Sequence, residues 1–122
     1  LKRRKRLTQN VRAGYLAPYD TFENRIAILK FVQDIPMEQS VPSYSVMQYI
    51  ESNLKQFDGY PILIIWGSED FCFNVKFLNK WREIFPRAEV RKVCNAGHLV
   101  VEDASDEIIP WIEGFLRKNN IF

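Results

Sequence analysis

The pattern of apolar residues changes near the middle of the chain, from helical spacing to a continuous run. In the first half, apolar side chains recur at helical spacing, which predicts two amphipathic helices over residues 21–35 and 43–57. Thr21 and Ser43 stand at the two expected N-cap positions. Residues 61–66, PILIIW, are instead a continuous apolar run rich in β-branched residues. Such a run is typical of a strand that is covered on both faces.

The second half alternates between strand and helix patterns. After the first strand, a helix is predicted over 73–85, a shorter strand over 88–93 and a last helix over 105–120. Ser105 is the expected N-cap of the last helix, and acidic residues occupy its first turn, where they interact favourably with the helix dipole. Two strands joined by a helix form a βαβ unit with parallel strands. The predicted fold class is therefore α/β.

The predicted sheet is incomplete. Parallel sheets need helices on both faces, and two strands alone expose unpaired backbone groups at both edges. The chain also opens on Leu1, in the middle of a basic stretch, which indicates a piece of a longer protein. The sequence leaves open whether the chain folds alone or self-associates through the open sheet edge.

Composition and charge exclude several classes of protein. Hydrophobic residues make up 47% of the 122-residue chain, so disorder is not expected. The longest apolar run is far shorter than the roughly 20 residues of a transmembrane helix. The net charge of +2 does not by itself indicate a nucleic-acid partner, and none is predicted. The basic run Lys2–Arg6 is interpreted as a solvated, helical or frayed terminus, and the alternatives are binding to nucleic acid or anionic lipid, or an import signal.

The two cysteines, Cys72 and Cys94, follow the two predicted strands. Two thiols do not make a disulfide framework, and the chain has no Cys-x-x-Cys motif or Cys/His ligand spacing. The sequence therefore predicts no metal and no cofactor, and a reducing, cytoplasmic location.

One acid and one histidine follow the two predicted strands and are candidates for chemistry. Asp70 lies four residues beyond the strand that ends at Trp66, and His98, the chain's only histidine, follows the strand that ends near Val93. In open α/β sheets, ligands bind beyond the carboxyl ends of the strands, and neighbouring strands lie about 4.8 Å apart. Loops of similar length can therefore bring the carboxylate to the imidazole. A carboxylate that accepts one ring N–H fixes the tautomer and leaves the other nitrogen free to act as a base.

Each of these two residues also has a structural alternative. An aspartate after a strand is most often a turn or cap residue, and a lone histidine is more often structural than catalytic. Glycine precedes each of them, Gly67 three residues before Asp70 and Gly97 directly before His98. This repeated arrangement favours the hypothesis of a catalytic pair.

Residues near the pair are weaker candidates for functional roles. Glu69 is an alternative acid, and Cys72 is interpreted as a packing residue because free cysteines are usually buried. Glu102 and Asp103 are interpreted as the start of the capping turn of the last helix. Four apolar residues are candidates for a substrate pocket or, alternatively, for the core: Trp66, Phe71, Phe73 and Leu99.

The stretches PILIIWGSED (61–70) and NAGHLVVEDASDEIIPWIEGFL (95–116) resemble the carboxyl-terminal part of the α/β-hydrolase fold. In that family, Gly-x-x-Asp after the penultimate core strand supplies the catalytic acid and Gly-His after the last strand supplies the base. The resemblance assigns these roles to Asp70 and His98. Residues 16–36 resemble the end of the cap and the re-entry helix of haloalkane-dehalogenase-like enzymes. Residues 68–86 are most similar to the branch that includes the β-lactone decarboxylases of olefin biosynthesis.

The resemblance also implies what the chain lacks. It places residues 1–58 at the end of the cap and the re-entry helices, and 59–122 in the carboxyl-terminal βαβα part of the hydrolase core. The family's nucleophile stands on a Gly-x-Asp-x-Gly or Gly-x-Ser-x-Gly elbow, which this sequence does not contain. The full enzyme is then expected to act on a small apolar halide, ester or β-lactone, and the 122-residue chain alone is expected to be inactive. The alternative is a non-catalytic fragment or interaction module.

Overall fold

The computed structural model describes residues 7–121, so the basic run Lys2–Arg6 and its expected solvated terminus lie outside the described residues. The described residues divide into two compact units. The first spans Thr8–Gln56 and is helical, and the second is formed mainly by the residues from Phe57 onward and contains both strands.

The helical unit contains α1 (Gln9–Leu16), α2 (Phe22–Gln33) and α3 (Ser43–Asn53). Short 3₁₀ turns follow α1 over Ala17–Tyr19 and α3 over Leu54–Phe57. The N-cap predicted for the helix over residues 21–35, which is α2, is confirmed, because the Thr21 side chain accepts the Asn24 N–H at 3.2 Å. The sequence patterns did not predict α1, which Thr8 caps by accepting the N–H of Val11 at 3.3 Å.

The predicted N-cap of α3 is wrong by one residue. Pro42 holds the N-cap position, and Ser43 is the first residue of the helix. The Ser43 hydroxyl instead donates to the carbonyl oxygen of Asp34 at 2.6 Å, which ties the start of α3 to the end of α2. Ser43 therefore lies inside the helix, and no side chain among the described residues caps the start of α3.

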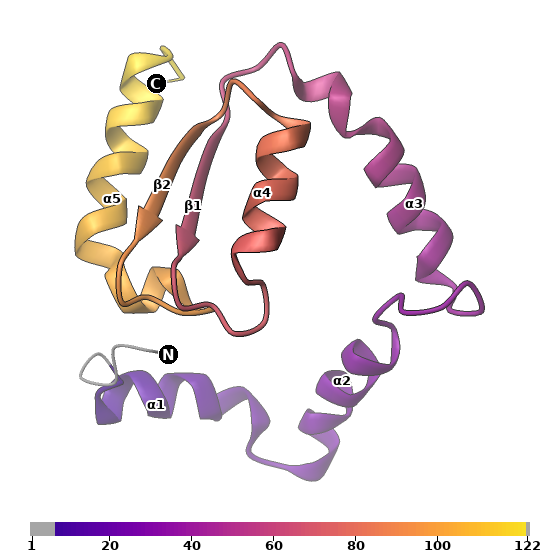
Figure 1. Ribbon diagram of the computed structural model, residues 1–122. Coiled ribbons are helices and arrows are strands. Elements are labelled where there is room, and N and C mark those ends of the chain that lie inside the picture. The colour runs from indigo at the N-terminus through magenta and orange to yellow at the C-terminus, as the bar shows by residue number, and fades with distance from the viewer. Residues whose placement is uncertain (1–6, 122) are drawn as a thin grey trace. The chain divides into compact units, whose positions relative to one another are not determined.

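The second unit is a βαβα unit made of β1 (Leu63–Gly67), α4 (Val75–Ile84), β2 (Glu89–Val93) and α5 (Val100–Lys118). The two strands pair in parallel, as predicted, with Ile65 opposite Arg91 and Gly67 opposite Val93. The helices α4 and α5 lie on opposite sides of the two strands (Figure 1). The described part of the chain is therefore helix-rich with a two-stranded parallel sheet, consistent with the predicted α/β class.

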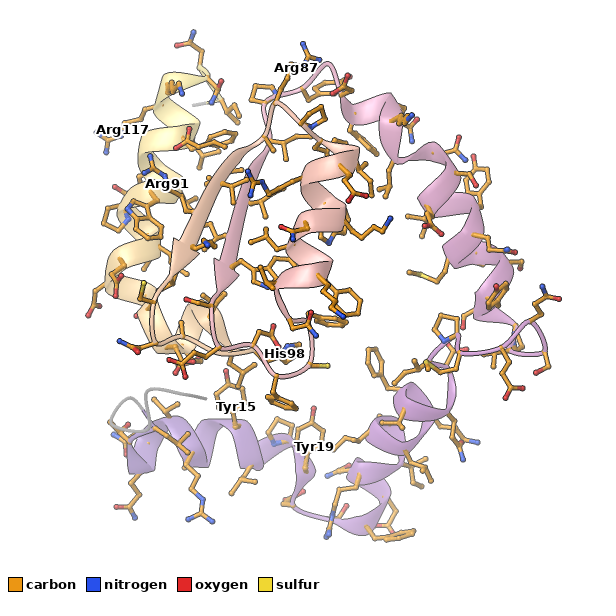
Figure 2. The ribbon with its side chains drawn as sticks, viewed as in Figure 1. Tyr15, Tyr19, Arg87, Arg91, His98 and Arg117 are labelled. Carbon is orange, nitrogen blue, oxygen red and sulfur yellow. The ribbon has the colours of Figure 1, made fainter. Side chains whose placement is uncertain are left out.

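Alternation along β1 and β2 decides which side chains face α5. Ile65 and Val93 point to this side and pack with Ala96, Ala104 and Ile108 to form the core. On the same face of the sheet, the Arg91 guanidinium lies 5.8 Å from the centre of the Trp111 ring, a cation–π contact. Figure 2 shows Arg87 and His98 at opposite ends of β2. The loop that follows β2 and contains His98 is therefore remote from the turn that precedes β2.

The last helix begins earlier than predicted. It starts at Val100 and has one non-helical residue, Ala104 (φ −144°, ψ 32°), where a short first turn meets the longer body of the helix. Ser105 therefore follows a kink inside α5 instead of standing outside the helix. The N-cap residue is Leu99, which makes no side-chain cap hydrogen bond, so the sequence offered no capping signal at the true start.

No helix among residues 7–121 is both long enough and apolar enough to cross a membrane.

Candidate active site

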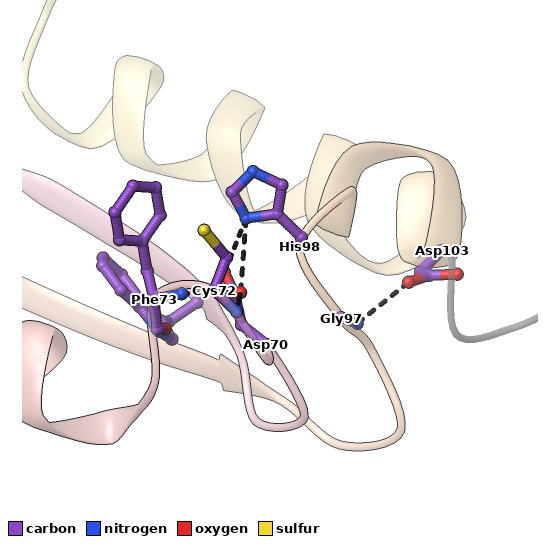
Figure 3. Close-up of polar contacts among 7 residues, drawn as sticks. Asp70, Cys72, Phe73, Gly97, His98 and Asp103 are labelled. Atoms are coloured by element: carbon purple, nitrogen blue, oxygen red, sulfur yellow. Dashed lines mark hydrogen bonds and ion pairs between the residues drawn. The ribbon is translucent and has the colours of Figure 1, made fainter. Parts of the chain in front are cut away.

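Asp70 and His98 meet at the carboxyl ends of the two strands. The His98 Nδ1 atom lies 3.1 Å from Asp70 Oδ2 and 3.2 Å from Asp70 Oδ1 (Figure 3). The Asp70 side chain is only 8% exposed, whereas that of His98 is 39% exposed. The structure thus brings together the two residues that the sequence singled out. The acid is largely buried and the imidazole is partly exposed to solvent.

Hydrogen bonds connect the loop that contains Asp70 to the loop that contains His98. The Ser68 N–H and the Ser68 hydroxyl both donate to the carbonyl oxygen of Val93, at 3.0 and 2.6 Å. The Glu69 N–H donates to the carbonyl oxygen of Ala96 at 2.9 Å. Gly67 permits this approach, because a Cβ atom there would lie 2.3 Å from the Gly97 carbonyl oxygen. The distance between Asp70 and His98 is therefore set by backbone contacts between neighbouring strand ends.

Asp70 has a structural role as well as its contact with His98. Its Oδ1 atom accepts the N–H groups of Cys72 and Phe73, each at 2.8 Å, and so closes the turn in which it lies. Burial on its own would raise the pKa of this carboxyl group. The N–H of Phe73, the His98 side chain and the N–H of Cys72 together outweigh burial and hold the pKa below its ordinary value. Asp70 is therefore an ionised acceptor over the neutral pH range.

The loop that contains Asp70 is held at its far end by Trp66. The indole Nε1–H of Trp66 donates to the carbonyl oxygen of Phe73 at 2.9 Å. Phe73 in turn packs edge-on against Phe77 of α4, with ring centres 5.1 Å apart. Trp66 therefore acts as a loop anchor.

The orientation of His98 leaves one nitrogen available for chemistry. When Nδ1 is protonated it donates to Asp70, and the lone pair of Nε2 is then free to accept a proton. Two aromatic rings lie near the His98 ring, whose centre is 5.3 Å from that of Phe73 and 6.3 Å from that of Phe71. The imidazole thus has apolar neighbours and remains partly exposed to solvent.

A shallow hollow of about 170 Å³ adjoins the pair. It is smaller than the roughly 300–1,000 Å³ that is typical of ligand pockets. A larger hollow of about 580 Å³ lies around residues 79–90, and its lining includes neither Asp70 nor His98. The residues that line the smaller hollow are Ile65, Trp66, Gly67, Asp70, Phe73, Gly97, His98 and Val100.

Other residues near the pair differ from the sequence interpretation. Cys72 is exposed, so its interpretation as a packing residue is wrong: the turn closed by Asp70 directs its side chain outward. Phe71 is 88% exposed and Leu99 is 43% exposed, so neither belongs to the core. No group of three or more His, Cys, Asp or Glu side chains that could hold a metal ion occurs among residues 7–121.

The sequence interpretation also missed the side chain of Asp103. This residue is in the first turn of α5, as expected, but it is fully buried, and its Oδ2 atom accepts the Gly97 N–H at 2.9 Å (Figure 3). An acid in the first turn of a helix is usually explained by its favourable interaction with the helix dipole. That explanation gave no reason to expect a hydrogen bond to Gly97, six residues earlier.

An acid that orients an imidazole at the ends of parallel strands is typical of enzymes that use a catalytic triad. The chain is similar to two proteins named cis-3-alkyl-4-alkyloxetan-2-one decarboxylase. It is 41% identical over 116 residues to the one from Shewanella oneidensis, which is 95% of this chain and 36% of that protein. It is 37% identical over 115 residues to the one from Xanthomonas campestris pv. campestris, which is 94% of this chain and 38% of that protein. The chain thus spans a little more than a third of the length of these relatives. No family model and no solved structure matches the chain.

Proposed function

We propose that this chain is the carboxyl-terminal part of an α/β-hydrolase-fold enzyme that decarboxylates β-lactones with two alkyl substituents. In this proposal residues 1–58 are the end of the cap and the re-entry helices, and 59–122 are the carboxyl-terminal part of the core. The observation that carries the proposal is the contact of 3.1 Å between His98 Nδ1 and Asp70 Oδ2 at the ends of adjacent parallel strands. The names of the two relatives, an oxetan-2-one being a β-lactone, supply the substrate class.

Asp70 and His98 have distinct roles in this proposal. Asp70 accepts the Nδ1–H of His98, which fixes the tautomer and stabilises the imidazolium that forms when Nε2 takes up a proton. His98 is the general base, and its partial exposure leaves Nε2 within reach of a substrate or of water. The two phenylalanine rings beside His98, Phe71 and Phe73, offer an apolar surface that suits alkyl groups.

The remaining parts of the reaction come from outside this chain. Loss of CO2 from an oxetan-2-one breaks the ring C–C bond to the carbonyl carbon and the ring C–O bond to the alkyl-bearing carbon, and it leaves an alkene. This net reaction consumes no water. A nucleophile on the preceding part of the protein would attack the ring carbon that bears the ring oxygen and displace that oxygen, which leaves a carboxylate on the neighbouring carbon. His98 would keep this carboxylate deprotonated, and loss of CO2 would then form the alkene and expel the nucleophile unchanged. With an ester or a halide as substrate, His98 would instead activate the water that hydrolyses the intermediate.

Product analysis tests this proposal. The full-length protein that contains this chain is incubated with a cis-3,4-dialkyl β-lactone, and the products are identified by gas chromatography with mass detection. We expect an alkene and CO2, with a rate that falls by a factor on the order of 10² to 10⁴ in His98→Gln. A β-hydroxy acid as the product would instead indicate hydrolysis, and turnover that does not depend on His98 would contradict the proposed role of the pair.

Two further measurements separate the parts of the proposal. We expect His98→Gln to accumulate a covalent adduct that intact-protein mass spectrometry detects, and the absence of an adduct would contradict the covalent route. We expect the 122-residue chain alone to have no turnover of β-lactone, p-nitrophenyl ester or haloalkane. Turnover by the short chain that is lost in His98→Gln would contradict its assignment as a part without the nucleophile.

A further inference from the structure

Asp103 is unusual among the described residues because its charged side chain is completely buried. Its exposed fraction is 0%, and no other polar or charged side chain among residues 7–121 is buried. A carboxylate in such a place must be compensated by hydrogen bonds. One of these bonds is the 2.9 Å contact from the Gly97 N–H to Asp103 Oδ2.

This hydrogen bond acts on the residue directly before His98. Glycine has more backbone freedom than any other residue, so a Gly-His step does not hold the histidine by its own conformational preferences. On one side, the carbonyl oxygens of Ala96 and Gly97 lie against Gly67, and the Glu69 N–H donates to Ala96. Asp103 holds the Gly97 N–H from the other side. The peptide units before His98 are therefore fixed by both neighbouring elements.

The kink in α5 allows Asp103 to reach this loop. The non-helical backbone at Ala104 separates the turn that contains Asp103 from the body of the helix. Ala104 and Ile108 are buried in the core against Val93, so the body of α5 is anchored to the sheet. Through Asp103, the helix is thus tied to the loop that contains His98, as Figure 3 shows.

We propose that Asp103 is a positioning residue for His98, and this inference rests on the proposed function of the Asp70–His98 pair. The carboxylate of Asp103 holds the Gly97 peptide so that the imidazole stays on Asp70. Asp103 does not line the hollow beside the pair, so it acts through Gly97 and not by contact with the substrate. A residue that served only the stability of α5 would leave the geometry of the pair unchanged.

Two measurements on the full-length protein distinguish positioning from stability alone. The first is kcat and KM for the β-lactone, measured where circular dichroism shows that each variant is folded. The second is the low-field proton resonance of the His98 Nδ1–H that donates to Asp70, assigned by its absence in His98→Gln. This resonance reports the geometry of the pair without any turnover, so it tests the inference even if the proposed substrate is wrong.

We expect Asp103→Ala to lower kcat at least tenfold with KM changed by less than twofold, and to lose or broaden the low-field resonance. Asp103→Asn retains an oxygen that can accept the Gly97 N–H, so we expect it to retain kcat within about threefold and to keep the resonance. Glu113→Gln, on the exposed side of the same helix, is the control and should change neither quantity.

If Asp103→Ala does not fold, Asp103→Ser takes its place with the same expected losses, because its shorter side chain cannot span the distance to Gly97. A folded Asp103→Ala protein that keeps both kcat and the resonance overturns the inference, whatever its melting temperature. Loss of both quantities in Asp103→Asn, as complete as in Asp103→Ala, overturns the role of the hydrogen bond to Gly97.

Discussion

Gly67 and Gly97 lie so close together that a Cβ atom on Gly67 would stand 2.3 Å from the carbonyl oxygen of Gly97 and 2.6 Å from that of Ala96. Both obstructing atoms belong to the backbone, so no side-chain rotation can relieve the clash. The loops that contain Asp70 and His98 are thus in contact at their bases, and this contact depends on the absence of a single methyl group.

Replacement of Gly67 by alanine should therefore separate the loops. We expect Gly67→Ala to lower the free energy of unfolding by about 1–3 kcal/mol, the usual cost of inserting a methyl group into a packed site. It should also weaken or abolish the low-field resonance of His98. Urea denaturation followed by circular dichroism measures the stability.

A matched glycine on α5 provides the control for this change. A Cβ on Gly114 would meet no atom within 4 Å, and the residue lies inside a helix. Gly114→Ala should therefore raise the free energy of unfolding, by about 0.5–1 kcal/mol. Equal effects of the two substitutions would contradict the close approach at Gly67.

The two roles of Asp70 can be separated by a pair of substitutions. Asp70→Ala removes the acceptor for the N–H groups of Cys72 and Phe73, and we expect a loss of about 1–3 kcal/mol in the free energy of unfolding. Asp70→Asn keeps one oxygen for these donors and should be less destabilising. Its amide presents N–H to His98 Nδ1 and favours the wrong tautomer, so kcat should fall strongly in both variants. Retention of kcat in Asp70→Asn would contradict the assignment of Asp70 as the acid.

The lowered pKa of Asp70 predicts a particular dependence of stability on pH. A carboxyl group whose pKa is lower in the folded than in the unfolded protein stabilises the fold above the unfolded pKa of about 3.9. This contribution is lost as the pH falls through the folded value. The difference in unfolding free energy between the wild type and Asp70→Asn should therefore shrink below about pH 4. Urea denaturation at pH 7, 5 and 3 measures it, and a difference that grows on acidification would contradict the prediction.

Glu89 offers a surface comparison for the pH measurement. Hydrogen bonds from Arg91 and Lys118 lower the pKa of its carboxyl group, in the same direction as at Asp70. These bonds are on the surface, where solvent screens ion pairs. We expect Glu89→Gln to show the same sign of pH dependence with a smaller amplitude.

Cys72 lies two residues from Asp70, yet only its backbone N–H is known to contact that residue. We expect Cys72→Ser to leave kcat within about twofold of the wild type, because the substitution keeps the backbone donor. A loss of tenfold or more in a folded Cys72→Ser protein would instead show that the thiol takes part in the reaction. Steady-state kinetics at one saturating substrate concentration is sufficient for this comparison.

The sequence predicted the parts of the fold that depend on local pattern. The apolar run at 61–66 has β-branched residues and no polar interruption, and it predicted a strand. The strand β1 occupies Leu63–Gly67, and its residues before Gly67 are half-buried, so the expected cover on both faces is not seen. Because β1 and β2 are parallel, their carboxyl ends necessarily meet at one edge of the sheet. The approach of Asp70 to His98 followed from this topology and from two loops of similar length.

The parts that the sequence did not predict depend on contacts between distant segments. The early start of α5 at Val100 has no polar cap, and the helix there is held by the core around Ala104. The burial of Asp103 depends on where the Gly97 N–H points, which only the folded loop determines. The exposure of Cys72 likewise results from the turn that Asp70 closes, and residue type alone favoured the opposite prediction.

The shared use of Asp70 Oδ1, which closes a turn and also approaches an imidazole, has an evolutionary consequence. If the proposed function holds, selection for folding alone would favour this aspartate even in a descendant that had lost the activity. Its presence in a newly sequenced genome is therefore a poor marker of a working enzyme. The histidine at the position of the solvent-accessible His98 is the better diagnostic, because drift can remove it without unravelling the loop.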